Sequence, residues 1–177
     1  MNFLIVTGLS GAGKSMAVNA LEDIGFFCID NIPAGLLPRI LDFAQQGENQ
    51  LSRVAVVMDI RGLHSVQETN EALEALDEKK MPYDILFLDA SDAAIRRRYK
   101  ETRRVHPMTI SEGIPVSEAI TKERQILQPL RERAKYVIDT SLLSTAQNRE
   151  RVSSLFLQKG QCAMSINCLL YTSPSPR

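Results

Sequence analysis

The sequence predicts an α/β fold in which helices cover both faces of a five-stranded parallel sheet. Three observations support this prediction: short apolar runs alternate with segments of helical periodicity, each run is followed by such a segment, and a glycine-rich turn follows the first run. Their near-continuous apolar character is typical of parallel strands buried on both faces. The predicted strands are 3–7, 26–29, 54–58, 85–88 and 136–138.

The first half of the chain predicts three helices between these strands. Apolar residues recur at helical spacing over 17–24, directly behind the glycine-rich turn. A second helix begins at or soon after Pro33, and a polar connection over 45–52 leads to the third strand. The apolar residues of the third helix lie within 66–76. This alternation favours βαβ units, which place strands parallel.

The second half continues the alternation with longer helices. One is predicted from Ser91 to about Arg104, and a short loop around His106 follows it. In the next helix Pro129 predicts a kink or a restart, because proline cannot donate the backbone hydrogen bond there. A last helix is predicted over 146–159, behind the fifth strand.

The glycine-rich turn itself has the pattern G-x-x-x-x-G-K-S, with a strand before it and a helix after it. Such a loop points successive backbone N–H groups at a phosphate chain, while its lysine reaches the β- and γ-phosphates. Lys14 is therefore a predicted catalytic residue, and the Ser15 hydroxyl is a predicted Mg²⁺ ligand. The alternative is a plain glycine turn. The predicted nucleotide-binding loop is Gly8, Leu9, Ser10, Gly11, Ala12, Gly13, Lys14 and Ser15. Together with the strand pattern it predicts a kinase-like P-loop NTPase fold.

Four strands end in an aspartate: Asp30, Asp59, Asp89 and Asp139. Ligands of α/β sheets sit outside the carboxyl ends of the strands, so each is a candidate. In kinase-like folds the third strand lies beside the first, which makes Asp59 the predicted catalytic Mg²⁺ ligand. Asp89 is the rival, and its alternative role is to cap the helix that begins near Ser91.

Asp30 has two open interpretations. Kinase-like relatives place a substrate-binding or basic carboxylate at the end of the second strand. With Asn31 beside it and Pro33 behind it, an Asx-type turn is equally consistent with the sequence.

The most basic segment follows the fourth strand and contains Arg96, Arg97, Arg98, Lys100, Arg103 and Arg104. The spacing of Arg96, Lys100 and Arg103 places them on one helix face. Together with Arg104 they are the candidate lid over the triphosphate, because guanidinium forks suit phosphate oxygens. RNA backbone contact and a plain solvated helix face are the alternatives. His106, in front of a proline, is interpreted as a hydrogen-bonding loop residue.

Composition excludes several classes of protein. Of the 177 residues, 44% are hydrophobic and 24% are charged, and 21 basic residues balance 21 acidic ones. The zero net charge gives no global attraction to nucleic acid or to membrane. No apolar run approaches the roughly 18 residues of a membrane span, so no membrane partner is expected and the protein is predicted to be cytoplasmic. Cys28, in an apolar run, is interpreted as a small core residue.

Several motifs in order resemble the RapZ/YvcJ-like family: GLSGAGKS at 8–15, LEDIGFFCIDNIP at 21–33, MDIRG at 58–62, LFLDASDAAIRRRYKETRRVHP at 86–107 and YVIDTS at 136–141. The resemblance implies binding of ATP and GTP with weak hydrolysis of each. The second nucleotide segment of the family falls on Asp59, Ile60, Arg61 and Gly62. We interpret it as part of the same site, with Asp59 at the metal and Arg61 sensing the nucleotide.

The resemblance also implies binding partners. In its best-known branch the protein binds small RNA and presents it to an endoribonuclease, which governs amino-sugar synthesis. Family members continue into a second domain, to which RNA binding and sugar-phosphate sensing are attributed. Here the nucleotide-binding domain is predicted over 1–160, with 161–177 a domain stub followed by a tail that does not resemble the family. Two origins stay open for that Ser/Pro-rich tail: translated sequencing-adapter sequence joined to a truncated frame, or a native short form.

Three functions from different classes follow from these features. The first is a regulatory domain that binds ATP or GTP, hydrolyses it weakly and signals to a C-terminal domain. The second is a small-metabolite or nucleoside monophosphate kinase, which requires transfer to an acceptor to outpace hydrolysis. The third is an RNA-binding adapter acting through the basic segment, although no aromatic residues interleave with those cations for base stacking as they would at a single-strand site. A homo-oligomer is compatible with each.

Overall fold

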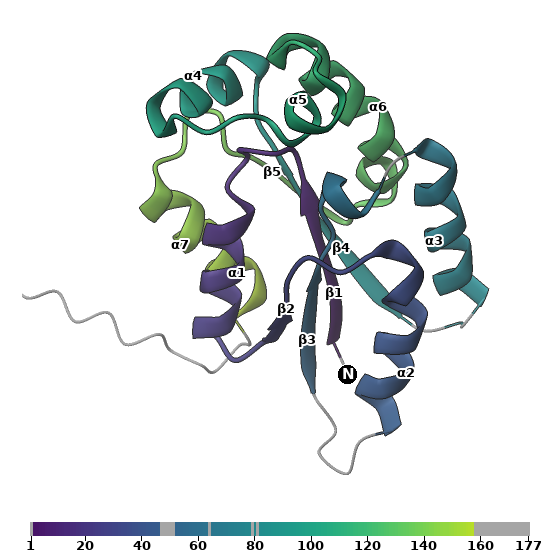
Figure 1. Cartoon of the computed structure of the whole chain (residues 1–177). Helices are drawn as coiled ribbons and strands as arrows, with labels where there is room; N and C mark the ends of the chain where they lie inside the picture. The colour runs from purple at the N-terminus through teal and green to yellow at the C-terminus, as the bar shows by residue number, and fades with distance from the viewer. Residues whose placement is uncertain (1, 47–51, 64, 79, 81, 158–177) are drawn as a thin grey trace, which may run out of the picture.

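The computed structural model describes residues 2–46, 52–63, 65–78, 80 and 82–157, and Figure 1 shows their course. Five parallel strands lie side by side in the order β2-β3-β1-β4-β5. The third strand is therefore the neighbour of the first, as a kinase-like order requires. The predicted fold class is confirmed. The strands are β1 (Asn2–Gly8), β2 (Phe27–Ile29), β3 (Arg53–Val57), β4 (Tyr83–Asp89) and β5 (Tyr136–Asp139).

Helices cover both faces of this sheet. In Figure 1, α1 and α7 lie on one side, α2, α3 and α6 lie on the other, and α4 and α5 stand above the carboxyl ends of the strands. Their bounds, including two short 3₁₀ helices η1 and η2, are α1 (Lys14–Asp23), η1 (Ala34–Leu36), α2 (Leu37–Gln46), η2 (Ile60–Gly62), α3 (Val66–Glu78), α4 (Asp92–Thr102), α5 (Pro107–Glu112), α6 (Val116–Arg133) and α7 (Thr145–Phe156).

The three inner strands hold the core. Every residue of β3 is buried, as are residues 85–88 of β4 and the side chains described in β1. Both faces of these strands are covered, which is why their sequences are continuous apolar runs rather than alternating ones. Burial of each large aliphatic side chain contributes roughly 1.5–3 kcal/mol, so this layer dominates the stability of the fold.

The strand predicted over 26–29 is less buried than its sequence suggests. It forms β2 at the edge of the sheet, where Phe27 is 52% exposed and Cys28 is half-buried. The interpretation of Cys28 as a core residue is therefore only partly right. Its environment is still apolar, and burial, ahead of the nearby charges of Glu22 and Asp30, raises the pKa of its thiol to about 11.

The predicted loop around His106 contains a helix. His106 caps α5, because its Nδ1 accepts the N–H of Met108 at 3.3 Å, and Pro107 takes the first turn. Gly113, with φ of 70°, ends the helix in the left-handed region. The sequence signals were present, but a helix of 6 residues is too short to show a hydrophobic period.

Two helix boundaries also differ from the prediction. The helix after the fourth strand ends at Thr102, because Arg103 takes a left-handed conformation with φ of 52°. Pro129 lies inside α6, which continues to Arg133 without a restart. The polar connection expected over 45–52 is in part helical, since α2 reaches Gln46. Residues 47–51 and 158–177, including the predicted stub and tail, lie outside the described residues.

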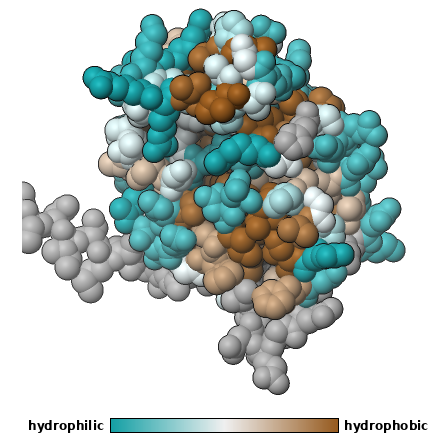
Figure 2. Space-filling model, viewed as in Figure 1, coloured by the Kyte–Doolittle hydropathy of each residue, from teal (hydrophilic) through white to brown (hydrophobic). Residues whose placement is uncertain are grey.

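Figure 2 shows hydrophobic side chains gathered in the lower middle of this face, over the sheet and the start of α2, with hydrophilic residues on the surrounding helices. Leu36 and Phe43, from η1 and α2, are among the exposed large hydrophobic residues of the molecule. Within the described part of the chain, no helix is both long enough and apolar enough to cross a membrane.

Candidate phosphate-binding site

The glycine-rich loop runs from the end of β1 into α1 at the carboxyl edge of the sheet. Two of its glycines are required by close approach and by positive φ. A Cβ at Gly8 (φ 140°) would stand 2.1 Å from the carbonyl oxygen of Leu88, and one at Gly13 (φ 96°) would stand 2.7 Å from the amide nitrogen of Asn148. A side chain at either position would force the loop away from β4 or α7.

Lys14 begins α1 and turns back over the loop. Its Nζ donates to the carbonyl oxygen of Gly8 at 2.7 Å, and the side chain is half-buried. Ser15 follows in the first turn and is exposed. The lysine ammonium and the positive end of α1 therefore face the same concave turn, which is the arrangement that an anion needs.

Asp59 lies at the end of β3, beside that turn. Its carboxylate is only 12% exposed, and Oδ2 accepts a hydrogen bond from the Arg61 guanidinium at 3.0 Å. Burial by itself raises the pKa of Asp59, but the charges of Lys14 and Arg61 outweigh burial and hold that pKa below its ordinary value. The carboxylate is therefore charged at neutral pH.

These side chains fit a magnesium ion. Mg²⁺ binds proteins through one or two oxygen ligands and keeps several waters. Asp59 Oδ1 is buried and has no hydrogen-bond partner among the described residues, and the exposed Ser15 hydroxyl offers a second oxygen. Ser15 and Asp59 accordingly stay the predicted metal ligands.

Asp89, the rival carboxylate, is engaged elsewhere. Its Oδ1 accepts from Arg124 at 2.9 Å and from the N–H of Ala90 at 2.8 Å, and its Oδ2 accepts from Arg131 at 3.2 Å. The alternative of a helix cap is wrong, because Ser91 caps α4 by accepting the N–H of Ala94. Asp89 thus fixes α6 to the end of β4.

The other two strand-end aspartates make local hydrogen bonds. Asp30 is exposed and accepts the N–H of Asn31 at 2.7 Å, and Asn31 has a left-handed φ of 58°. The chain bends there, but this bond reaches the next residue and not the one after it, so it is not the hydrogen bond of an Asx turn. Asp139 accepts from the N–H of Ser141 at 2.8 Å and from its hydroxyl, and these bonds lower the pKa of Asp139.

The basic segment reaches the phosphate loop through a residue other than the candidate lid. Arg98 donates to the carbonyl oxygen of Gly11 at 2.9 Å and to both Oγ1 and the carbonyl oxygen of Thr140. The candidate lid residues are exposed, and Arg103 lies past the end of α4 instead of on its face. The exposed set is Arg96, Lys100, Arg103 and Arg104.

The strand-to-helix turn after β5 closes the far side of the loop. Thr140 Oγ1 donates to the carbonyl oxygen of Ala12 at 2.9 Å, and Asn148 Nδ2 lies 3.3 Å from the carbonyl oxygen of Gly13. Both side chains are buried. The carbonyls of Gly11, Ala12 and Gly13 thus have protein donors, and the loop N–H groups without a hydrogen bond to the described residues are those of residues 11 and 13–15.

A buried acid–imidazole pair stands behind the start of the loop. Glu123 of α6 accepts the N–H of Ser10 at 3.0 Å and its hydroxyl at 2.7 Å. His106 Nε2 lies 3.0 Å from the other carboxylate oxygen. Glu123 and His106 are both 0% exposed, so the interpretation of His106 as a hydrogen-bonding residue agrees with its contacts.

A family model described as the RapZ-like N-terminal domain matches residues 1–160. The chain belongs to this family. The matched range contains the phosphate loop, Asp59 and the basic segment, and the resemblance carried by their motifs is confirmed.

Curated relatives of this RapZ-like domain are bacterial proteins named nucleotide-binding protein. One from Moorella thermoacetica is 50% identical over 157 residues, which cover 86% of this chain and 52% of the relative. One from Alkaliphilus oremlandii is 43% identical over 161 residues, covering 91% of this chain and 55% of the relative. The chain spans about half the length of the curated relatives it matches.

Solved structures resemble the RapZ-like domain in fold. The tunicamycin resistance protein of Deinococcus radiodurans has a TM-score of 0.56 at 14% identity and covers 88% of this chain and 95% of its own. The shikimate kinase of Acinetobacter baumannii, in complex with shikimate, has a TM-score of 0.55 at 20% identity and covers 88% and 92%. At such identities the likeness shows the shared α/β P-loop fold alone.

Sequence reasoning missed four residues that shape this site of the RapZ-like domain: Arg98, Glu123, Thr140 and Asn148. Glu123 left a signal, because it is a charged residue among the buried apolar positions of α6. An acid on such a face is buried at a high cost unless donors meet it. Arg98 lies in the basic segment and Thr140 in the segment YVIDTS, but nothing in the sequence distinguishes either from its neighbours, and Asn148 looks like an ordinary surface polar residue.

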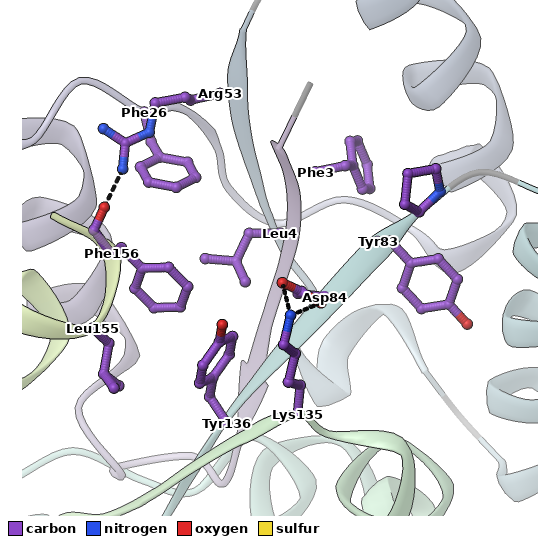
Figure 3. Close-up of a pocket in the computed structure, with 11 residues that line it drawn as sticks. Phe3, Leu4, Phe26, Arg53, Tyr83, Asp84, Lys135, Tyr136, Leu155 and Phe156 are labelled. Atoms are coloured by element: carbon purple, nitrogen blue, oxygen red, sulfur yellow. Dashed lines mark hydrogen bonds and ion pairs between the residues drawn. The ribbon is translucent and has the colours of Figure 1, made fainter. Parts of the chain in front are cut away.

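The opposite edge of the sheet carries an aromatic hollow of about 350 Å³, shown in Figure 3. The rings of Phe26, Tyr136 and Phe156 line it. Arg53 donates to the carbonyl oxygens of Ile24 and Phe156 and stacks 4.2 Å from the centre of the Phe26 ring. The guanidinium of Arg53 thus links the C-terminal ends of α1 and α7 through hydrogen bonds.

Proposed function

We propose that this RapZ-like domain binds Mg²⁺ with ATP or GTP in the phosphate loop and hydrolyses the nucleotide slowly, as a regulatory domain. One observation carries the proposal: the charge of Lys14, in the loop, acts on Asp59, and Asp59 has a buried carboxylate oxygen without a hydrogen-bond partner among the described residues. The names of the curated relatives support nucleotide binding. ATP and GTP are both included because the family resemblance implies both.

The residues of the site would bind different parts of the Mg²⁺–nucleotide complex. Lys14 would exchange the carbonyl of Gly8 for phosphate oxygens, and the N–H groups at the start of α1 would hold the phosphate chain. Ser15 and Asp59 would hold Mg²⁺, which supplies charge neutralisation between the phosphates. Arg61, which is exposed and forms a hydrogen bond to Asp59, would sense the nucleotide.

Slow hydrolysis follows from the same electrostatics. The charges that lower the pKa of Asp59 make it a weak base, so it suits a metal better than a proton from water. Arg98, the one cation of α4 with a hydrogen bond to the loop, is committed to Gly11 and Thr140. The described side chains thus favour holding a triphosphate over cleaving it.

The wider role is proposed for the longer protein to which this domain belongs in its relatives. The matched range covers only 55% and 54% of two relatives, which leaves room in them for a second domain that reads the nucleotide state. Following the family resemblance, we propose a cytoplasmic protein in which that second part binds small RNA and an endoribonuclease.

The decisive experiment follows the γ-phosphate. The full 177-residue chain is incubated with Mg²⁺ and γ-labelled ATP or GTP, with and without a pool of sugars and nucleoside monophosphates. Slow release of inorganic phosphate from both nucleotides, indifferent to the pool, is the expected result. Label that moves onto a pool component would identify a kinase instead. Absence of nucleotide binding by the wild-type chain would overturn the proposal.

A further inference from the structure

We propose that Glu123 is a positioning residue that fixes the start of the phosphate loop and keeps the Ser10 N–H out of the phosphate cradle. The inference rests on the proposed function, because it says how the loop is shaped for a nucleotide. It narrows the cradle to the N–H groups of residues 11 and 13–15, because the N–H of Ala12 donates to the carbonyl oxygen of Leu9 at 2.9 Å. It also makes α6, which lies far from the loop in sequence, part of the nucleotide site.

The first argument is the geometry of the contact. The Ser10 N–H lies 3.0 Å and 3.1 Å from the two carboxylate oxygens of Glu123, and the Ser10 hydroxyl donates to one of them at 2.7 Å. Hydrogen bonds to a carboxylate are shorter and stronger than those between neutral groups. Both donors of Ser10 are therefore directed at Glu123.

The second argument is which nitrogen of the His106 ring carries the proton. His106 Nδ1 accepts the N–H of Met108 at 3.3 Å, so the ring proton belongs on Nε2. That proton is donated to Glu123, 3.0 Å away. The carboxylate thus receives three donors, two from Ser10 and one from His106, and none of its partners needs a proton from it.

The third argument is burial. Glu123 is 0% exposed and stands between apolar residues of α6. A buried carboxylate is tolerated only where donors replace its water, and here the loop supplies two of the three. Removal of the carboxylate would leave the Ser10 N–H buried without a partner. The loop and α6 consequently hold each other in place.

The fourth argument is the connection to α4 and α5. The Tyr99 ring lies 5.4 Å from the His106 ring, and a Cβ at Gly11 would meet the Tyr99 ring at 3.4 Å. Tyr99, His106 and Glu123 therefore form a wall behind residues 10 and 11. A phosphate entering the cradle from the other side would meet a loop that is already shaped.

Amide hydrogen exchange tests the inference in the free protein. The Ser10 amide is expected to be strongly protected before nucleotide is added, and its protection should not change when Mg²⁺-ATP binds. The amides of residues 11 and 13–15 should gain protection on binding, whereas the Ala12 amide already donates to the carbonyl oxygen of Leu9. A Ser10 amide that exchanges freely in the free protein, or that becomes protected only with nucleotide, would overturn the inference.

Affinity measurements on variants complete the test. Glu123→Gln places an amide N–H₂ against Ser10 or His106, and we expect it to weaken Mg²⁺-ATP binding at least about tenfold in protein that remains folded. Glu118→Gln, an exposed position on the same helix, is the matched control and should bind as the wild type does. Normal affinity in folded Glu123→Gln protein would contradict a positioning role.

Ser10→Ala covers the case in which Glu123→Gln fails to fold. It removes the hydroxyl and keeps the N–H, so a loss of only a few-fold is expected, with the amide at position 10 still protected. In a double-mutant cycle the two changes should be less than additive, because they remove the same contact. Wild-type protein that binds no nucleotide would overturn the proposed function separately, since the exchange of Ser10 in the free protein does not depend on it.

Discussion

The two edges of the one sheet use charged groups in opposite ways. At the carboxyl edge, Lys14 is held by a single carbonyl and Asp59 keeps a buried oxygen with no partner in the described structure. At the amino edge, Arg53 binds two helix-end carbonyls and stacks on Phe26, and Lys135 pairs with Asp84. Charged groups at the carboxyl edge can therefore still bind a ligand. Most of the charged groups at the amino edge are already bonded within the protein.

The difference shows how a candidate binding site can be distinguished from a cavity whose charged groups are bonded within the protein. The cavity of about 350 Å³ lies at the amino edge, yet its charged groups already have partners within the protein. At the carboxyl edge, glycines, a lysine and a carboxylate oxygen without a partner among the described residues meet at one turn. An unpartnered polar atom alone does not mark the site, because Arg53 Nε at the hollow is also buried without a partner in the described part of the chain. The combination of groups that suit a phosphate and a metal therefore locates the candidate site better than volume does.

The largest effect is expected on stability at the amino edge. Arg53→Ala should lower the free energy of unfolding by about 3 kcal/mol, because it removes two charge-assisted hydrogen bonds and a cation–π contact from a buried position. Urea denaturation followed by circular dichroism measures the change. Nucleotide affinity of the folded variant should equal that of the wild type, and a clear loss of affinity would break the division between the edges.

Lys14→Ala is the reciprocal change at the carboxyl edge. It should weaken Mg²⁺-ATP and Mg²⁺-GTP binding at least about 100-fold, or ~2.7 kcal/mol, while the fold stays intact. Isothermal titration calorimetry measures the affinity. Lys135→Ala is the matched control, because that exposed lysine lines the opposite edge, and it should bind as the wild type does. Normal binding by Lys14→Ala would refute the phosphate loop.

Two carboxylates at the same edge sharpen the comparison further. Asp59→Asn should slow Mg²⁺-dependent hydrolysis at least about tenfold, because it replaces a charged metal ligand with a neutral one. Asp89→Asn should instead cost about 1 kcal/mol of stability, because it weakens the contacts to Arg124 and Arg131. Phosphate-release assays and thermal unfolding of both variants test these expectations. If Asp89→Asn slows hydrolysis more than Asp59→Asn does, Asp89 is the metal ligand.

The smallest effect is a pH dependence. Because the folded pKa of Asp59 lies below its unfolded value, the charged carboxylate stabilises the fold above the unfolded pKa. That contribution is lost as the pH falls through the folded pKa. Unfolding free energies of wild type and Asp59→Asn should therefore converge below about pH 4. In Lys14→Ala protein the folded pKa of Asp59 should rise, because the ammonium no longer opposes burial, so the loss should be smaller and complete at a higher pH. An unchanged profile would exclude the Lys14 contribution.

Much of this could be predicted from the sequence. The strands and the phosphate loop follow from local patterns, whereas the neighbouring positions of β1 and β3, and with them Asp59 beside the loop, were expected from the strand order of kinase-like folds. The fold and the family are confirmed. The short helix α5 and the exposed β2 were not predicted. A helix of 6 residues is too short to show a hydrophobic period. An apolar run predicts a strand but does not indicate whether that strand lies at the edge or in the centre of the sheet.

The sequence by itself determined the phosphate loop, because a glycine-rich turn with a following lysine carries its own geometry within 8 residues. Only the tertiary structure decided what holds that loop. Ser10 and Glu123 are 113 positions apart, and Arg98 reaches the carbonyl of Gly11 across 87. Such contacts exist only once α4 and α6 pack over the sheet, because no local spacing records which donor a buried carboxylate will meet.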